Sequence, residues 1–261
     1  MDSLLIKPRH GNKNTLPLEL HWSRNGKGTP LPIRRVRGHR ANPPPIALAW
    51  SPRYASSSRH QLHVKQSTPD HHSGLDFGHA IHSVCQDIVS HSPEFKHLHL
   101  PQILITITQS RTAHRHGLQA KVTPLRFRKG QMIEKRRGKL LQVQRYWLDQ
   151  VELLYLVTFC LPRFLNQPFE EKCITLFHEL YHIAPEFNGD LRRHGGRCAI
   201  HTSSKKAYDQ SMLRLAEDYL NRTPNRHLHS FLKLNFEQLQ ACHGQVFGHV
   251  VPIPKLVPVE I

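Results

Sequence analysis

The apolar positions along the chain change their period several times, and each period predicts a different element. From residue 73 the period is helical, with apolar residues at Phe77, Ala80, Ile81, Val84 and Ile88. Ser73 is the expected N-cap of this helix and Pro93 its expected stop. The sequence therefore predicts a first core helix between these two residues.

The next two segments have the alternating period of strands. Residues 103–108 are ILITIT and residues 118–123 are LQAKVT. Because proline cannot donate to a sheet ladder, Pro124 predicts that the second of these strands lies at a sheet edge. Further strands are predicted at 140–146 and 152–160, and the latter is apolar enough to be buried on both faces.

A second helix is predicted over NQPFEEKCITLFHELYHIAPEF, which is residues 166–187. Asn166 can cap this helix, Pro168 suits its start, and Pro185 marks its far end. Two glutamates in its first turn complement the helix dipole. The pattern is that of an amphipathic helix that follows a set of strands.

Two more helices are predicted in the last third of the chain. One runs from Ser203 or Ser204 to Asn221, and a shorter one runs from Asn235 to a Gly244 cap. The final segment, VPIPKLVPVEI, is expected to be extended. The succession of elements predicts an α+β fold, in which a small mixed sheet packs on the second helix and the C-terminal lobe is helical.

Composition separates a basic N-terminal segment from the rest. Of the 261 residues, the first 72 hold 12 Lys or Arg against 3 acids and contain 9 of the 19 prolines, with little apolar periodicity. We expect residues 1–72 to be a basic, disordered or loosely attached extension of a domain formed by residues 73–261. The extension is either an arm that contacts nucleic acid or a solvated segment that adds nothing to the fold.

Cysteine usage and hydropathy indicate the cellular compartment in which the protein is expected. The five cysteines are odd in number, widely spaced and free of any C-x-x-C pair, which argues against a disulfide framework or a zinc ribbon. No apolar run approaches the roughly 20 residues of a membrane helix, and the N-terminus lacks the apolar stretch of a secretory signal. We therefore expect a cytoplasmic protein that does not enter a membrane.

The chemistry suggested by the sequence lies in the second helix. His178 and His182 are four residues apart, so their imidazoles project from one face and can bind one Zn²⁺. Glu179 falls beside such an ion rather than on it, where it can act as general base on zinc-bound water. The alternative is a core helix whose histidines are merely hydrogen-bonded.

These residues carry a family resemblance. FHELYHI resembles the active-site helix of the zincin metallopeptidases, and the order of elements resembles the zincin fold over residues 73–221. More narrowly, PLRFRKG, FHELYHIAPEFNGDLRR and HTSSKKAYD resemble bacterial and phage-type metallopeptidases, which are themselves similar to SprT-like proteases. The resemblance implies a zinc-dependent peptidase that hydrolyses peptide bonds.

The same resemblance frames the search for a third metal ligand. Metzincins place Gly three and His six residues after the second metal histidine, where this chain has Pro185 and Asn188, so that subclass is excluded. SprT-like proteins take their third histidine from a later segment, for which His201 and His194 are the candidates. We prefer His201, because it directly precedes the start of the next predicted helix.

Other side chains stay open as alternatives. Asp190 and Glu186 could supply oxygen ligands, although both are equally explained as loop residues that pair with Arg192 or Arg193 or bond to turn backbone. Glu217 would be the ligand under a thermolysin-like arrangement. Tyr208 is a candidate oxyanion stabiliser, with packing of the later helix as the competing explanation.

Two functions follow from these observations. The first is a zinc metallopeptidase acting on a peptide or protein, which could lie antiparallel to the edge strand of residues 118–123. The second is a nucleic-acid-associated protein whose zinc is structural, with residues 1–72 as the binding arm. The two can coexist, since the SprT resemblance implies protease action on DNA-bound proteins.

Overall fold

The computed structural model describes residues 22–23, 31–32, 46–49, 61–66, 74–110, 117–193, 205–222 and 225–259. Of the first 72 residues it describes only the backbones of four short strands, β1 (Trp22–Ser23), β2 (Leu31–Pro32), β3 (Ile46–Ala49) and β4 (Gln61–Gln66). The rest of that segment lies outside the described residues. The predicted extension and its boundary at residue 72 therefore stay predictions.

Helices and strands alternate through the described part of the chain. The helices are α1 (Phe77–His91), α2 (Phe169–Tyr181), α3 (Lys205–Asn221) and α4 (Phe236–His243). The further strands are β5 (Leu75–Asp76), β6 (Ile103–Gln109), β7 (Ala120–Pro124), β8 (Ile133–Arg136), β9 (Lys139–Val143), β10 (Arg145–Leu148), β11 (Val151–Leu153), β12 (Tyr155–Leu161), β13 (Val246–Phe247) and β14 (Leu256–Pro258). The predicted α+β class is confirmed.

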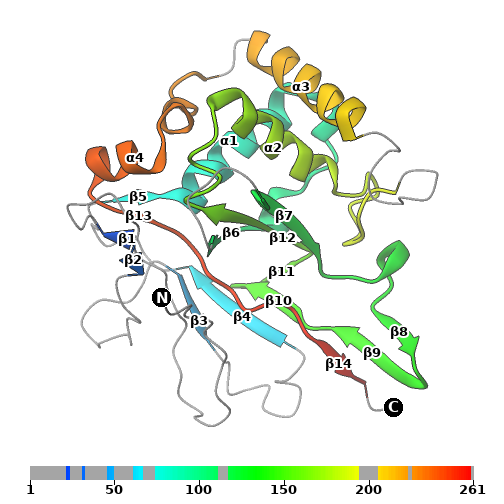
Figure 1. The fold of residues 1–261 in the computed structure, drawn as a ribbon. Helices are drawn as coiled ribbons and strands as arrows, with labels where there is room; N and C mark the ends of the chain where they lie inside the picture. Colours follow the sequence, from blue (N-terminus) through cyan, green and yellow to red (C-terminus); the bar gives the residue numbers. More distant parts are fainter. Residues whose placement is uncertain are drawn as a thin grey trace.

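A three-stranded sheet of order β6-β12-β7 lies at the centre (Figure 1). β12 pairs with β6 in parallel and with β7 in antiparallel orientation. Six of the seven β12 residues are buried, because the strand is covered on both faces as its continuous apolar sequence predicts. β7 lies at the edge of this sheet, which confirms the inference drawn from Pro124.

The two faces of the central sheet are buried differently. α1 and α2 cover one face (Figure 1), where they form the main core with the side chains of Ile105, Val157 and Phe159. On the opposite face, Leu104 and Leu156 pack against a second, smaller core built from Leu125, Tyr146 and Leu153. Because successive strand residues point to opposite sides, one apolar strand serves both cores.

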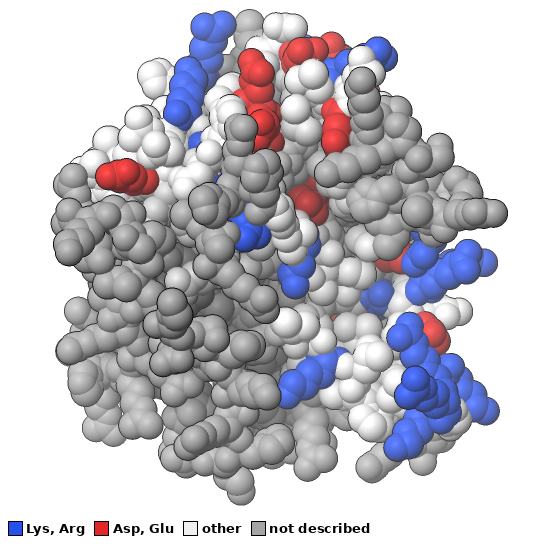
Figure 2. All heavy atoms as spheres, in the orientation of Figure 1, with Lys and Arg blue, Asp and Glu red and all other residues white. Residues whose placement is uncertain are grey.

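Single residues divide two of the predicted strands. The strand expected at 140–146 is split at Gln144, whose N–H donates to Lys255 O at 2.8 Å. As a result β9 joins the sheet β14-β9-β8, whereas β10 joins the sheet β11-β10-β4-β3. Leu154 likewise separates β11 from β12. The hairpin of β8 and β9 extends to one side of the molecule, and Lys and Arg side chains gather over it (Figure 2).

The helix ends differ from the sequence expectations in three places. Asp76, not Ser73, caps α1, because its carboxylate accepts the N–H of His79 at 3.0 Å. Asn166 does not cap α2, which starts after Pro168; its side chain instead accepts the N–H of Phe236 at 3.3 Å. α2 also ends at Tyr181, with His182 as its C-cap, before the expected stop at Pro185. The helix expected to end at Asn221 and the short helix capped by residues 235 and 244 are found where expected.

Two further observations bear on the sequence expectations. Within the described ranges, none of the helices is both long and apolar enough to cross a membrane. The thiols of Cys85, Cys160, Cys173 and Cys242 are free, and the fifth cysteine lies outside the described residues.

Candidate metal centre

Helix α2 presents one face to the core and the other to the candidate centre. Cys173, Leu176, Phe177 and Leu180 are buried in the main core, as the helical apolar period requires. The next face carries the H-E-x-x-H residues. The helix ends with Tyr181, and His182 occupies its C-cap position.

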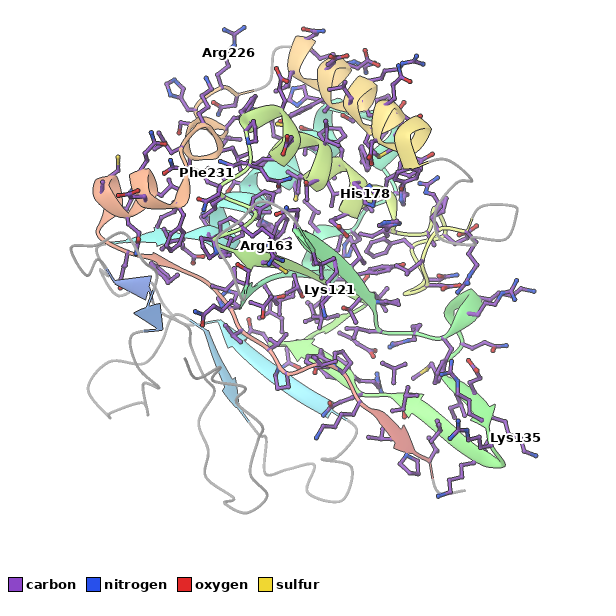
Figure 3. The ribbon with its side chains drawn as sticks, viewed as in Figure 1. Lys121, Lys135, Arg163, His178, Arg226 and Phe231 are labelled. Atoms are coloured by element: carbon purple, nitrogen blue, oxygen red, sulfur yellow. The ribbon has the colours of Figure 1, made fainter. Side chains whose placement is uncertain are left out.

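The structure brings the two histidines together. The ring centroids of His178 and His182 are 4.5 Å apart and the ring planes are inclined by 81°. His182 is buried, whereas the side chain of His178 is 19 % exposed. Figure 3 shows His178 on α2 where that helix approaches the beginning of α3. Two neighbouring imidazoles are the donor set expected for a borderline metal ion such as Zn²⁺.

Glu179 lies between this pair and the edge of the central sheet. It is only 6 % exposed, and burial raises its pKa to about 8, although a hydrogen bond from the Val122 backbone lowers it. Val122 belongs to the edge strand β7. The carboxyl group therefore contacts the strand that an extended peptide could pair with.

Helix α3 contributes two neighbours of the histidines. The ring of Tyr208 lies 4.8 Å from that of His178 and is stacked 6.0 Å from that of His182. Asp209 faces His178, with 3.8 Å between the carboxylate Oδ1 and the ring Nδ1. This distance is in ion-pair range and longer than a hydrogen bond. A carboxylate beside one ring nitrogen favours that orientation of the imidazole and leaves the other nitrogen for a metal.

Asp209 was not among the residues predicted from the sequence. Its only sequence signal was its place in HTSSKKAYD, directly after Tyr208. Adjacent helix residues do not share a face, so nothing in the pattern indicated that both would turn towards α2. The packing angle of α3 against α2 decides this, and that angle depends on tertiary contacts.

The same helix is anchored at its other end by a buried polar network. Tyr219 Oη donates to Asp87 Oδ2 of α1 at 2.5 Å, and it lies 2.7 Å from Nε2 of the buried His229. Burial is the main reason that the pKa of Tyr219 is raised, and the Asp87 carboxylate adds to the effect. The network ties the C-terminal part of α3 to α1.

The loop after α2 folds back on the helix end. Ile183 and Leu191 form an isolated antiparallel bridge, and the N–H of Arg192 donates to His182 O at 2.7 Å. The Arg192 side chain donates from Nε to Tyr181 O at 2.8 Å, and its guanidinium lies 4.0 Å from the centre of the Tyr181 ring. Arg192 thus satisfies two carbonyls that the end of a helix leaves open.

The acidic alternatives to a third histidine are exposed or already paired. Asp190 accepts from the Lys129 N–H at 2.8 Å and from Arg193 Nη2 at 2.9 Å, the pairing that the loop interpretation predicted. Burial raises the pKa of Asp190, but these partners outweigh it and hold that pKa below its ordinary value. Glu186 and Glu217 are exposed.

The third ligand itself is not decided. His194 and His201 both lie in residues 194–204, outside the described residues. Among the residues that the structure describes, no three His, Cys, Asp or Glu side chains gather as a metal site would require. The preference for His201 over His194 therefore stays a prediction.

Comparisons with known proteins give one family match. No curated protein and no solved structure gives a significant match to the chain. Residues 79–203 match the model of a family described as "Putative phage metallopeptidase". The matched segment runs from α1 to the residues before α3 and includes His178, Glu179, His182 and His201. This match confirms the resemblance to phage metallopeptidases, and it is to that family that this part of the chain is similar.

Proposed function

We propose that this protein is a zinc-dependent peptidase whose centre is formed by His178 and His182, with Glu179 as general base. The observation that carries the proposal is the pair of imidazoles 4.5 Å apart on one helix, beside a buried carboxyl group. The family match supports it, because the matched residues include all three. A zincin-like arrangement is the corresponding proposal for the fold.

The donor set fits a zinc ion. Two histidine nitrogens and a third donor from a later segment are a common protein set for catalytic zinc, which keeps one position for water or substrate. Asp209 Oδ1 lies 3.8 Å from His178 Nδ1, which is ion-pair range, and it would act as the carboxylate partner that metal-bound histidines usually have. When bound, zinc polarises the scissile carbonyl and lowers the pKa of water to about 7.

Glu179 would move the proton. Burial raises its pKa to about 8, and a cation nearby lowers the pKa of a carboxyl group, which restores the charged form that a base needs. The carboxylate would take a proton from the attacking water and return it to the departing amine. Its burial keeps other water away from this transfer.

The edge strand β7 would hold the substrate. β12 pairs with one edge of β7. The other edge of β7 lies beside α2, where the backbone of Val122 contacts Glu179. An extended peptide laid antiparallel to β7 gains main-chain hydrogen bonds that do not depend on its sequence. The Glu179 carboxyl group would then lie beside the backbone of the bound peptide.

Two variants test the proposal, with fluorescein-labelled casein as the substrate and metal analysis of each purified protein. Glu179→Gln should retain zinc and lose roughly 10²–10⁴-fold in cleavage rate, as expected for removal of a general base. His182→Ala should lose both zinc and cleavage. Full cleavage by Glu179→Gln would exclude this mechanism, and zinc retained by an inactive wild-type protein would favour a structural metal. The cytoplasmic location stays a prediction.

A further inference from the structure

The positive charge of the chain has two centres, and only one of them is the N-terminal segment. Residues 126–145 contain eight Lys or Arg and a single acid, a net charge of +7. Residues 1–72 carry +9 of the total of +17, so the residues outside these two segments together contribute only +1. Nearly all the excess charge of the remaining chain is therefore confined to twenty consecutive residues.

Most of these cations face solvent on one projecting element. Arg126 and Arg145 both form short ion pairs with Glu152. The remaining six are exposed on the hairpin of β8 and β9 and the turn that precedes it: Arg128, Lys129, Lys135, Arg136, Arg137 and Lys139. Of these, Arg136 also pairs with Glu134 on the same strand, at 2.7 Å. Figure 2 shows this cluster, and Figure 3 shows Lys135 at the end of the hairpin. Lys255, which precedes β14 of the same sheet, is also exposed.

The hairpin turn has an arginine, Arg137, at a position where the backbone conformation favours Gly or Asn. β8 and β9 pair up to Arg136 and Lys139, which leaves Arg137 and Gly138 as a two-residue turn with φ of 48° and 79°. Such turns favour Asn or Gly at the first position, because a side chain in the left-handed region costs about 1–2 kcal/mol. An arginine there brings charge to the tip at a conformational cost.

We propose that this hairpin is a binding site for the phosphate backbone of double-stranded nucleic acid. β14 pairs with β9 at Leu141–Val143, so the tip from Arg136 to Lys139 extends past this pairing as a two-stranded ribbon. Such a ribbon is narrow enough to enter a major groove, which is about 12 Å wide. Cations on both faces of the ribbon, Lys135 on one and Lys139 on the other, would reach phosphates on either side. The contact would be independent of base sequence, because lysine and arginine on phosphate carry no base information.

The distribution of apolar side chains argues against a membrane as the partner. Residues 135–139, which form the tip, are KRRGK and contain no apolar side chain. The exposed apolar residues Met132 and Ile133 lie at the base of the hairpin instead. A hairpin that entered a bilayer interface would carry aromatic or aliphatic residues at its tip.

A triple substitution of the full chain tests the site. Lys135→Gln, Arg137→Gln and Lys139→Gln together should weaken binding to a short fluorescein-labelled DNA duplex of mixed sequence by roughly tenfold or more, measured by anisotropy. The slope of log affinity against log salt should fall by about 2–3, since each lost phosphate contact removes about 0.9. Cleavage of labelled casein should not change, which separates this site from the proposed peptidase centre.

A matched triple variant controls for net charge. Arg214→Gln, Arg226→Gln and Lys233→Gln remove three exposed cations from α3 and from the segment between α3 and α4, and should leave the salt slope nearly unchanged. Equal losses in both triple variants would overturn the proposal in favour of a general charge effect. If the hairpin variant binds the duplex as tightly as the unmodified protein, the proposal is overturned. Any DNA binding would then come from residues 1–72 or from elsewhere in the chain.

A single substitution at the turn excludes misfolding as an explanation. Arg137→Asn removes one cation and relieves the left-handed backbone, so it should raise the melting temperature while lowering the salt slope by about 1. Two alternative partners are tested in the same way: vesicles of anionic phospholipid, and free polyglutamate. If the triple variant loses binding to either of these but keeps its DNA affinity, the partner is a membrane or an acidic protein and the proposal fails.

Discussion

The two ends of helix α2 each bury an ionisable side chain, and the comparison separates structure from chemistry. Near the N-terminus Lys172 is 1 % exposed, and near the C-terminus Glu179 is 6 % exposed. Burial shifts both groups toward neutrality: it lowers the pKa of Lys172 to about 8 and raises that of Glu179 to about 8. The same physical cause therefore acts at both ends.

The surroundings of the two groups differ. Lys172 donates from Nζ to Leu232 O at 2.9 Å and to Leu234 O at 2.7 Å, so fixed backbone acceptors surround it. Glu179 has two imidazoles for neighbours, and these could hold a cation that restores its charge. A buried charge that is satisfied by backbone ties elements together, whereas one that lies beside metal ligands is suited to react. Changes at the two ends should then affect different measurements.

The largest effect outside the three motif residues is expected at Asp209. Asp209→Ala should weaken zinc binding by about 10–100-fold, because His178 loses the carboxylate that orients its ring. Chelator competition measures this affinity. The free energy of unfolding of the metal-free protein should change by less than about 0.5 kcal/mol, since the Asp209 side chain is 40 % exposed.

Asp218 is the matched control for this variant. It is an exposed acid on the same helix, and Asp218→Ala should leave zinc affinity unchanged. If Asp209→Ala and Asp218→Ala weaken zinc binding equally, general electrostatics explain the effect. The contrast between the two ends of α2 would then lose its strongest support at the C-terminal end.

Arg192 should show an intermediate result that affects both measurements. Arg192→Ala removes the hydrogen bond to Tyr181 O and the contact with the Tyr181 ring, and should cost about 1–3 kcal/mol of unfolding free energy. Zinc affinity should fall several-fold, because the carbonyl bond that steadies the helix end next to His182 is lost. Urea unfolding and chelator competition measure the two effects.

Arg193 provides the comparison for Arg192. Its guanidinium pairs with Asp190, which also accepts backbone N–H groups, so Arg193→Ala should cost less than about 1 kcal/mol and leave zinc affinity intact. A loss of zinc affinity in Arg193→Ala that matched the Arg192 variant would assign the effect to the loop as a whole. Arg192 would then have no special role at the helix end.

The sequence predicted the part of this arrangement that depends on local periodicity. The helix spacing of His178 and His182 gave their common face, and Pro124 gave the edge position of β7. Both follow from the geometry of a single element and need no knowledge of its neighbours. The helix that carries the motif was therefore predictable in its position and in the face that it presents.

The parts that depend on contacts between elements were not predictable. The apolar pattern of residues 140–146 contains no signal for the switch of sheets at Gln144, because the pattern is the same for one strand or two. Ser73 and Asp76 are both good caps, and only the path of β5 into α1 selects Asp76. Asp209 joins the centre only through the packing of α3 on α2.

The smallest expected effect lies at the N-terminal end of α2 and concerns pH. The folded state gives up the Lys172 proton near pH 8, whereas the unfolded chain holds it to about pH 10.5. Between these values the unfolded state binds more protons, so the contribution of Lys172 to the free energy of unfolding rises with pH. Below pH 8 both states are protonated and the contribution is constant.

Lys172→Met makes this contribution measurable. The variant loses the two bonds to Leu232 O and Leu234 O and should be less stable than the wild type at every pH. The stability difference should widen from pH 8 to pH 10 in urea unfolding of the metal-free proteins, because only the wild type gains from release of a buried proton. Zinc affinity should be equal in the two proteins. A constant difference over this range would mean that burial does not lower the pKa of Lys172. Burial would then not shift the ionisable groups at both ends of α2 toward their neutral forms.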